Sequence, residues 1–227
     1  MRGLFVAEID GRRDCPEGMD ATMELTVTEF VTLDGVVQSP GAPEEDPSGG
    51  FAHGGWVQPH SSPEFGAHVV DIFSRADAFL LGRGTYDIFA GYWPKVTAPD
   101  DPIAGPLNRL PKYVASTTLR RVEWANSKLL EGDTVEAVRR LKALPGRELQ
   151  VHGSGGLFQT LLEHDLVDVL HLHVFPVTLG SGRRLFGTGT QPRTLQLAAS
   201  RITPNGVVLL TYRRAGPLRT GTIGQPD

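Results

Sequence analysis

The sequence lacks several features that would place it in other classes of protein. It has one cysteine, Cys15, which excludes an internal disulfide and any cysteine-based zinc cluster. No apolar run approaches the roughly 20 residues that span a bilayer, and the first residues lack the basic and then apolar pattern of a signal peptide. The net charge of -4 and the pI near 6.0 argue against a general nucleic-acid binder. We therefore expect a cytoplasmic protein that engages neither nucleic acid nor membrane.

The composition present is that of a globular protein, with 227 residues of which 40% are hydrophobic. Residues 1–22 show no sustained period, so we expect an N-terminal extension there. Residues 23–214 carry the apolar patterns and form the expected folded domain. Residues 215–227 are polar and contain glycine and proline, so we expect a flexible tail.

Apolar patterning predicts strands and helices that alternate along the chain. The expected strands are 24–32, 78–81, 112–116, 149–152, 167–177, 195–201 and 207–213, and the expected helices are 63–76, 84–91, 134–143 and 157–163. This alternation predicts an α/β fold with a mostly parallel sheet. Asn205-Gly206 between the last two strands predicts an antiparallel hairpin at one edge of that sheet.

Residues 38–63 form a long segment rich in proline, glycine and serine, with almost no pattern. A loop of this length inside a domain is usually functional or disordered. Phe51 and Trp56 favour a loop that packs against a bound ligand or against the domain itself. Trp56 either caps a bound substrate or anchors the loop to the domain.

Three short polar loops follow predicted strands: Gly82-Arg83-Gly84-Thr85, Ser116-Thr117-Thr118 and Gly153-Ser154-Gly155-Gly156. Ligands of open α/β sheets bind at the carboxyl ends of the strands, and helix N-termini there suit phosphate. A guanidinium and several hydroxyls add donors. Together the loops match the pyrophosphate and the 2′-phosphate of NADPH, although each alone is also a plain turn or helix cap.

The glycine run is neither a Rossmann fingerprint, whose last glycine would fall at Phe158, nor a Walker loop. NAD sites place an acidic residue on the ribose 2′-hydroxyl. No carboxylate follows Ser116 before Glu123, which favours NADPH over NADH as the cofactor.

These motifs in this order resemble the dihydrofolate reductase superfamily. Thr32-Leu33-Asp34-Gly35 and the run from Pro176 to Gly182 resemble more closely the reductase domain of riboflavin biosynthesis, the RibD C-terminal domain family, as a stand-alone member. The resemblance covers about residues 24–213. It implies a three-layer α/β/α sandwich, NADPH as cofactor, hydride transfer to a small-molecule substrate, and a homodimer.

The resemblance also implies roles for individual residues. The cofactor-binding residues would be Gly82, Arg83 and Thr85 on the adenosine-side phosphates, Ser116 and Thr117 near the 2′-phosphate, and Gly153, Ser154, Gly155, Gly156 and Leu157 on the pyrophosphate. Asp34 would lie by the nicotinamide and the substrate, and the loop from Gly180 to Arg183 would close over the site. Trp56, Gly180 and Arg183 are thus the candidate substrate contacts.

Asp34 is the first candidate for orienting the substrate or relaying a proton, and Glu64 is the second. The alternatives are a turn former before Gly35 for Asp34 and an ordinary first-turn helix carboxylate for Glu64. The first long helix offers no convincing match to the carboxylate that anchors the pterin in folate reductases, so folate is not the expected substrate. The deaminase half that often accompanies the riboflavin reductase is also absent from this sequence.

The expected activity is an NADPH-dependent reduction of a small heterocyclic (pyrimidine- or pterin-like) or carbonyl substrate, similar to that of 5-amino-6-(5-phosphoribosylamino)uracil reductase. The alternative is a non-catalytic NADPH-binding or regulatory module on the same fold. His171 and His173 lie on one face of a predicted strand, where they either bind a metal or pack. Because no third ligand is evident, no metal site is predicted.

Overall fold

The computed structural model describes residues 22–98 and 100–224. Its elements in chain order are β1 Glu24–Thr32, η1 Ser48–Gly50, η2 Gln58–His60, α1 Pro63–Ser74, β2 Ala76–Gly82, α2 Arg83–Tyr92, η3 Trp93–Lys95, α3 Ala104–Arg109, β3 Lys112–Ala115, β4 Ser127–Leu129, α4 Thr134–Lys142, β5 Glu148–His152, α5 Gly155–Glu163, β6 Val169–Phe175, β7 Arg193–Ile202 and β8 Val208–Pro217. Within the described part, no helix combines the length and apolar character needed to cross a membrane.

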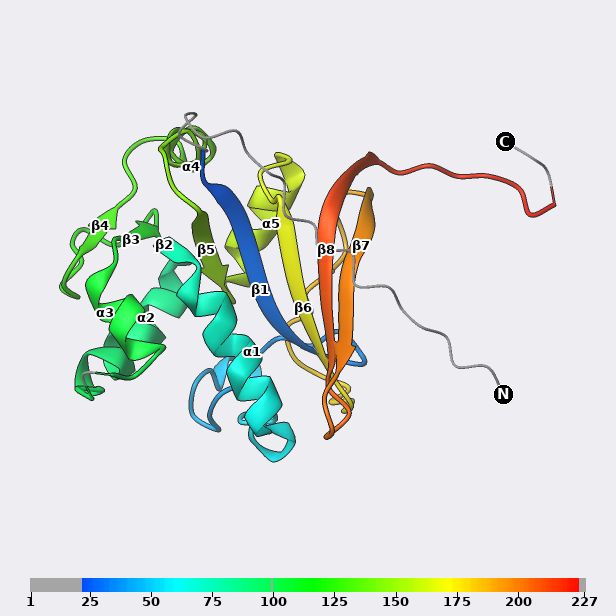
Figure 1. Cartoon of the computed structure of the whole chain (residues 1–227), viewed down its shortest axis with the longest axis horizontal. Coiled ribbons are helices and arrows are strands. Elements are labelled where there is room, and N and C mark those ends of the chain that lie inside the picture. Colours follow the sequence, from blue (N-terminus) through cyan, green and yellow to red (C-terminus); the bar gives the residue numbers. More distant parts are fainter. Residues whose placement is uncertain (1–21, 99, 225–227) are drawn as a thin grey trace.

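The strands form one mixed sheet in the order β4-β3-β2-β5-β1-β6-β8-β7. The first six strands in this order are parallel, whereas β8 runs antiparallel to β6 and β7 runs antiparallel to β8 (Figure 1). Thr203 accepts a hydrogen bond from Gly206, whose φ is 80°, so the Asn-Gly signal does mark the turn between β7 and β8. The predicted α/β class, the parallel sheet and the C-terminal hairpin are confirmed.

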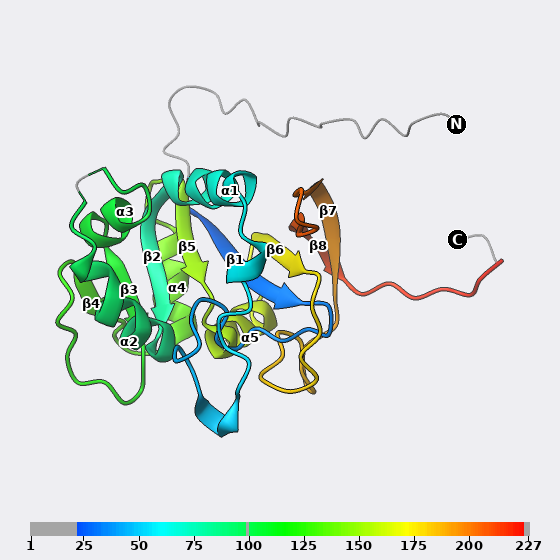
Figure 2. The same cartoon turned by 90° about the horizontal axis from the view of Figure 1, so that it is seen from below.

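Helices cover both faces of the sheet, as Figure 2 shows with α1 on one side and α4 and α5 on the other. The side of α4 and α5 is apolar: Leu25, Val27 and Leu149 of the strands pack there with Val138 and Phe158 of the helices. Most residues of β1 and β5 are buried because helices cover both faces of the sheet, and their side chains alternate between mainly apolar residues on the α4–α5 side and mainly polar residues on the α1 side.

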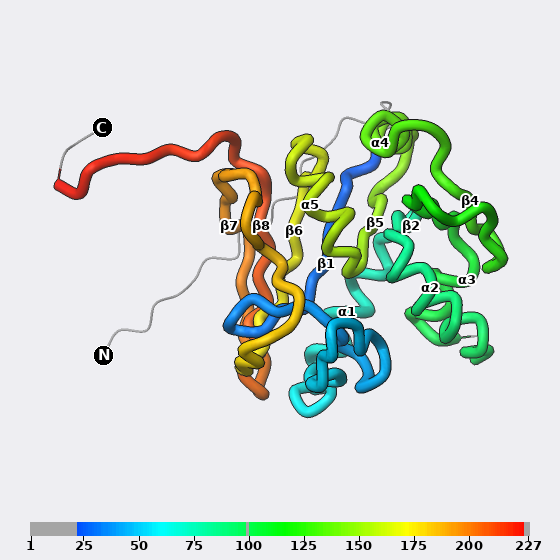
Figure 3. The backbone as a smooth tube through the Cα atoms, turned by 180° about the vertical axis from the view of Figure 1, so that it is seen from behind, coloured from blue at the N-terminus to red at the C-terminus, as the bar shows by residue number. Residues whose placement is uncertain are grey.

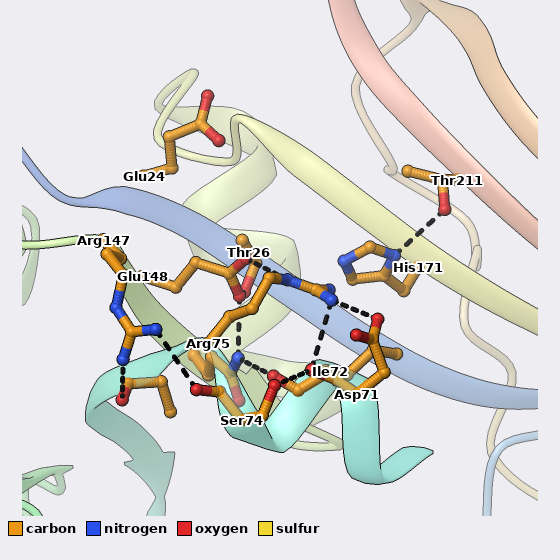
Figure 4. A network of polar contacts seen from close by, with 12 residues as sticks. Glu24, Thr26, Asp71, Ile72, Ser74, Arg75, Arg147, Glu148, His171 and Thr211 are labelled. Atoms are coloured by element: carbon orange, nitrogen blue, oxygen red, sulfur yellow. Dashed lines mark hydrogen bonds and ion pairs between the residues drawn. The ribbon is translucent and has the colours of Figure 1, made fainter. Parts of the chain in front are cut away.

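The side of α1 is more polar. Arg75, at the end of α1, donates from Nε to Glu148 Oε1 (2.7 Å) and pairs with Asp71 (Figure 4). Gln150 Nε2 donates to the Ile72 carbonyl oxygen (2.6 Å) and to Glu148 Oε2 (2.7 Å). Hydrogen bonds to buried polar strand residues therefore fix α1 on the sheet.

The ranges expected from the sequence agree with the observed bounds of most elements to within two or three residues. Ser62 Oγ accepts from Phe65 N (3.2 Å), and Asp133 Oδ1 accepts from Glu136 N (3.0 Å), so each of these residues caps the helix that follows it. The sequence pattern missed α3 and β4, which are too short to show a period. Strand β6 is shorter than expected, ending just before Pro176, which has no N–H for the ladder.

The segment 38–63 is not an unpatterned loop in the structure. It carries two short 3-10 turns, and Phe51, Trp56 and Val57 are buried. Of the expected N-terminal extension, all but Thr22 lies outside the described residues. At the other end, β8 continues to Pro217, and the described residues after it run away from the body of the molecule (Figure 1).

Candidate functional site

Two helices begin at the carboxyl ends of neighbouring strands without a side-chain cap. Gly82, which has no side chain, precedes α2, and Ser154, whose hydroxyl accepts no hydrogen bond from its helix, precedes α5. By contrast, Ser62 caps α1 and Asp133 caps α4. The first turns of α2 and α5 therefore keep N–H groups that can bind an anion.

Ser154 joins these two helix starts. Its Oγ accepts from Gly82 N (3.0 Å) and donates to Thr85 Oγ1 (2.9 Å). Its φ of 65° is left-handed, which costs a non-glycine residue roughly 1–2 kcal/mol. Gly153 N in turn donates to the Thr28 carbonyl oxygen (3.1 Å), so the loop leaves the sheet directly from the β1–β5 pair. The structure thus brings together Gly82, Thr85 and the glycine run.

The space in front of these helix starts is open. A Cβ atom built on Gly84 or Gly156 would meet no heavy atom within 4 Å, and one on Gly155 would meet only Val37 Cγ2, at 4.0 Å. Leu157 is half-buried and packs against the apolar core. The backbone of the loop can therefore be approached closely, as a phosphate group requires.

Arg83 connects α2 to the third predicted loop. Its Nη1 donates to Thr118 Oγ1 (2.5 Å), and Ser116 Oγ accepts from the N–H groups of Thr118 (3.2 Å) and Leu119 (3.0 Å). Thr117 is exposed beside them. The guanidinium and the hydroxyl cluster that the sequence grouped therefore do lie together, at one end of the sheet's carboxyl edge.

The sequence reading overlooked a carboxylate at this place. Asp87 lies one helical turn after Arg83, and its Oδ2 is 3.4 Å from Arg83 Nε. The i,i+4 spacing on the predicted helix was the signal that could have found it. Both side chains are about half exposed (53% and 51%), so the pair leaves the guanidinium accessible.

Asp34, the first candidate for a catalytic role, is fully engaged. Its carboxylate accepts from Thr32 Oγ1 (2.6 Å), Leu179 N (3.2 Å) and Gly180 N (2.8 Å). The bonds from Thr32 and Gly180 lower the pKa of Asp34 to about 2. Asp34 therefore remains ionised and holds the loop after β6, which suits a positioning role better than proton relay.

The segments after β1 and after β6 lie side by side (Figure 3), as backbone hydrogen bonds between residues 33–37 and 177–185 require. Gly180 has a φ of 72°, and its N–H donates to the Asp34 carboxylate. Arg183 pairs with Asp46 and donates to Ser48 Oγ (2.9 Å), so its side chain secures the 38–63 segment. A Cβ atom on Gly182 would lie 2.8 Å from the side chains of Phe51 and Val36, so only glycine fits where these two side chains pack against the loop.

Trp56 is buried and belongs to an aromatic cluster. Its Nε1 donates to the Gln38 carbonyl oxygen (2.8 Å), and its ring lies 5.3 Å from that of Phe175. Phe30 and Phe65 complete the cluster, each with a ring 5.4 to 5.7 Å from Phe175. This geometry favours the role of loop anchor over that of substrate cap.

Glu64 lies in the first turn of α1. Hydrogen bonds from its own backbone N–H and from the Ser62 hydroxyl lower its pKa. These are the contacts of an ordinary first-turn carboxylate. Its catalytic role stays a prediction.

The histidines of β6 are packed under α1. His173 Nε2 is 3.2 Å from His68 Nε2, and His171 Nδ1 is 3.1 Å from Thr211 Oγ1. Burial lowers the pKa of both strand histidines, that of His171 to about 3. Among the described residues, no three His, Cys, Asp or Glu side chains are grouped as a metal site requires.

Glu29 is a buried acid that the sequence reading did not single out. Only 2% of it is exposed, its Oε1 has no hydrogen-bond partner in the described part of the chain, and burial raises its pKa to about 8. By strand alternation it shares the α5 side of β1 with Val27 and Val31. A carboxylate at a position that alternates with the apolar residues Leu25, Val27 and Val31 was the available signal.

The sequence matches the model of the RibD C-terminal domain family over residues 23–209. It is 31% identical to the uncharacterized protein YyaP of Bacillus subtilis over 157 residues, which are 68% of this chain and 81% of YyaP.

Solved structures of other proteins share the fold, and two of them are compared below. A proposed riboflavin biosynthesis protein from Shewanella sp. PV-4 has a TM-score of 0.64 at 24% identity, over 85% of this chain and 99% of that one. Dihydrofolate reductase from Enterococcus faecalis, complexed with NADP(H), has a TM-score of 0.53 at 14% identity, over 84% of this chain and 96% of that one. The chain therefore has the dihydrofolate-reductase-like fold and belongs to the RibD C-terminal domain family.

Proposed function

We propose that the protein is a reductase that binds NADPH at the carboxyl edge of β2, β3 and β5. The observation that carries this proposal is the pair of uncapped helix starts, α2 and α5, joined by the hydroxyl of Ser154. Two adjacent sets of free N–H groups suit a ligand with several phosphates. The E. faecalis dihydrofolate reductase, which shares the fold, is complexed with NADP(H) and supports the same choice.

Each loop has a separate task in this proposal. Residues 153–157 hold the pyrophosphate, with Gly82 and Thr85 on the adenosine-side phosphates. Arg83 binds the 2′-phosphate with the Ser116 and Thr117 hydroxyls, because a guanidinium and hydroxyl donors converge there. When bound, NADPH supplies the hydride.

The substrate in this proposal is a small heterocycle, pyrimidine- or pterin-like, or a carbonyl compound. Asp34 contributes by fixing the backbone of Leu179 and Gly180 at the end of β1, where the substrate would lie. Gly180, Arg183 and Trp56 shape that side through the loops they hold. Glu64 remains a second candidate for contact with the substrate.

One observation favours the alternative, a non-catalytic NADPH-binding or regulatory module. The rings of Phe30, Phe65, Trp56 and Phe175 fill the space between the start of α1 and the sheet. Asp34 and Arg183 are also occupied by contacts within the chain. A module of this kind binds NADPH without turning it over.

The first test is a thermal-shift titration with NADPH and, separately, NADH. Ligand at about 100 times its dissociation constant adds about 2.7 kcal/mol to the free energy of unfolding. For a chain of this size that is a rise in Tm of roughly 5–10 °C. We expect this rise with NADPH and little with NADH, whereas no shift with either at millimolar concentration would refute the proposal.

The second test separates the reductase from the module. NADPH oxidation is followed by absorbance in the presence of reducible pyrimidines, pterins and small carbonyl compounds. We expect turnover with one of these classes. Binding of NADPH without turnover in any class would support the module.

A further inference from the structure

A carboxylate lies next to the guanidinium that we place at the 2′-phosphate of NADPH. Asp87 follows Arg83 by four residues on α2, and its Oδ2 is 3.4 Å from Arg83 Nε. Residues four apart on a helix share one face, so the backbone of α2 keeps the two side chains together whether or not a cofactor is bound. An anion that binds Arg83 therefore binds beside a negative charge.

The nitrogen atoms of the Arg83 guanidinium have different partners. Nε faces Asp87, and Nη1 donates to Thr118 Oγ1 (2.5 Å). Nη2 has no hydrogen-bond acceptor among residues 22–98 and 100–224. A phosphate bound through two parallel hydrogen bonds would combine Nη2 with either Nη1 or Nε. On either edge the phosphate would share one positive charge with the Asp87 carboxylate.

The charges around this pair nearly cancel. Asp87, Arg120, Arg121 and Glu123 line one open hollow beside α2, and Arg83 pairs with Asp87. Glu123 in turn pairs with Arg121 (3.0 Å). Three arginines thus face two carboxylates, which leaves one positive charge in excess. A phosphate monoester carries about −1.5 to −2 charges at pH 7, so the local charge would match a phosphate better without Asp87.

Asp87 has two opposing effects on the binding of a phosphate. It orients Arg83, which favours binding, and it competes for the guanidinium and repels the phosphate, which opposes binding. The two side chains are 53% and 51% exposed, and an exposed pair of this kind restrains its partner only weakly. Thr118 also restrains the guanidinium from another side. The competition with a group of nearly two negative charges is therefore the larger effect.

NADH responds differently, because it presents a ribose 2′-hydroxyl where NADPH presents the 2′-phosphate. A neutral hydroxyl is not repelled by a carboxylate and can donate a hydrogen bond to it, which is how NAD sites use an acidic residue. Along the chain, no carboxylate follows Ser116 before Glu123. The fold nevertheless brings Asp87 from a different element to the same place. Asp87 therefore opposes the binding of NADPH without opposing that of NADH.

We propose that Asp87 is a specificity-determining residue of the cofactor site, where it competes with the 2′-phosphate for Arg83 and so limits the preference for NADPH over NADH. This inference rests on the proposed binding of NADPH at these loops. Arg83 produces the preference, and Asp87, one helical turn away, reduces its size.

Isothermal titration calorimetry of the whole chain with NADPH and, separately, NADH tests this inference. Asp87→Asn removes the charge and keeps the shape of the side chain. We expect it to strengthen NADPH by about three- to tenfold at low salt and to leave NADH unchanged. The gain should largely disappear in about 1 M salt, where charges are screened beyond about 3 Å. Asp87→Glu keeps the charge and should retain the NADPH affinity of the natural chain.

Glu136→Gln is the matched control, because it removes the carboxylate of a similarly exposed pair, Glu136 with Arg139 on α4. It should change neither dissociation constant. The inference is wrong if Asp87→Asn leaves the affinity for NADPH unchanged, weakens it, or strengthens NADPH and NADH equally. These outcomes differ from a failure of the proposed function, in which neither the natural chain nor Asp87→Asn binds NADPH at millimolar concentration. That result would refute the cofactor site and this inference with it.

Discussion

Arg83 is the residue that we expect to distinguish NADPH from NADH in the proposed site. It reaches from α2 to Thr118 and stands beside the hydroxyl of Ser116. Asp87 pairs with the guanidinium of Arg83, so part of that positive charge is already balanced within the chain. In the proposed NADPH site, recognition of the 2′-phosphate would depend on Arg83 more than on any other residue of this loop.

We expect Arg83→Ala to weaken NADPH by about 10- to 100-fold and NADH by much less, because a charge-assisted hydrogen bond contributes about 1.5–3 kcal/mol. Dissociation constants from isothermal titration calorimetry check this. Arg139→Ala, an exposed arginine of α4, is the matched control. Equal losses for both cofactors would place Arg83 away from the 2′-phosphate.

Glu29 gives the stability a pH dependence. Its pKa rises from 4.5 to about 8 on folding because the carboxyl group is buried. The folded chain therefore holds this proton where the unfolded chain releases it, so the stability that the protonated carboxyl provides is lost as pH rises from 4.5 to 8. The buried histidines act in the opposite sense, since their lowered pKa values cost stability as pH falls below 6.5.

We expect Glu29→Gln to gain stability relative to the natural chain as pH rises, by roughly 3 kcal/mol between pH 5 and pH 8. Urea unfolding at both pH values measures this difference and cancels the contribution of the histidines. Glu131→Gln, at an exposed glutamate, is the control. A difference that stays constant with pH would show that Glu29 is charged in the folded protein.

At the scale of elements, the four longer helices divide into two kinds. Helices α1 and α4 begin with side-chain caps, and α2 and α5 begin with none. A missing cap leaves the fold about 1 kcal/mol less stable than a Ser, Thr or Asp cap would. The helices without caps are those that start at the proposed phosphate loops.

We expect Gly156→Asp to weaken NADPH at least tenfold, because a carboxylate in the first turn of α5 repels the pyrophosphate. The same carboxylate should leave the free energy of unfolding unchanged or raise it by up to about 1 kcal/mol, through its favourable contact with the helix dipole. Thermal shift with and without NADPH measures both effects. Gly66→Asp in α1 is the control, and the prediction fails if the two variants bind NADPH alike.

At the scale of the whole molecule, the sheet ends in an uncovered strand. Strand β7 pairs only with β8, runs for 10 residues, and exposes Leu197 (50%) and Ile202 (69%). A long exposed edge with apolar side chains is an aggregation hazard unless another chain covers it. By contrast, β6 lies between β1 and β8, so its edges are not free.

We therefore propose that the protein is a homodimer through β7. Light scattering after size exclusion should give about twice 24.6 kDa. Leu197→Glu should shift the protein toward monomer, whereas Leu144→Glu, at a leucine exposed to a similar extent (46%), should not. A monomeric natural chain at micromolar concentration would contradict this proposal.

The features that depend on neighbours along the chain could be predicted from the sequence. Asn205-Gly206 predicted the hairpin, and apolar periodicity predicted the longer helices, because turns and helices depend on residues within about four positions along the chain. Apolar runs separated by helices implied a parallel sheet, and a parallel sheet puts the ends of its strands at one edge. That reasoning brought the residues of three distant loops to one expected site.

The tertiary structure alone decided which contacts the candidate residues make. Asp34 is bound by Gly180, 146 positions away, and Arg183 is committed to Asp46. Trp56 turned inward to Gln38 rather than outward to a ligand. A local pattern specifies the face on which a side chain lies and not the distant partner that meets it, so these roles and the order of the strands emerge only when the chain is folded.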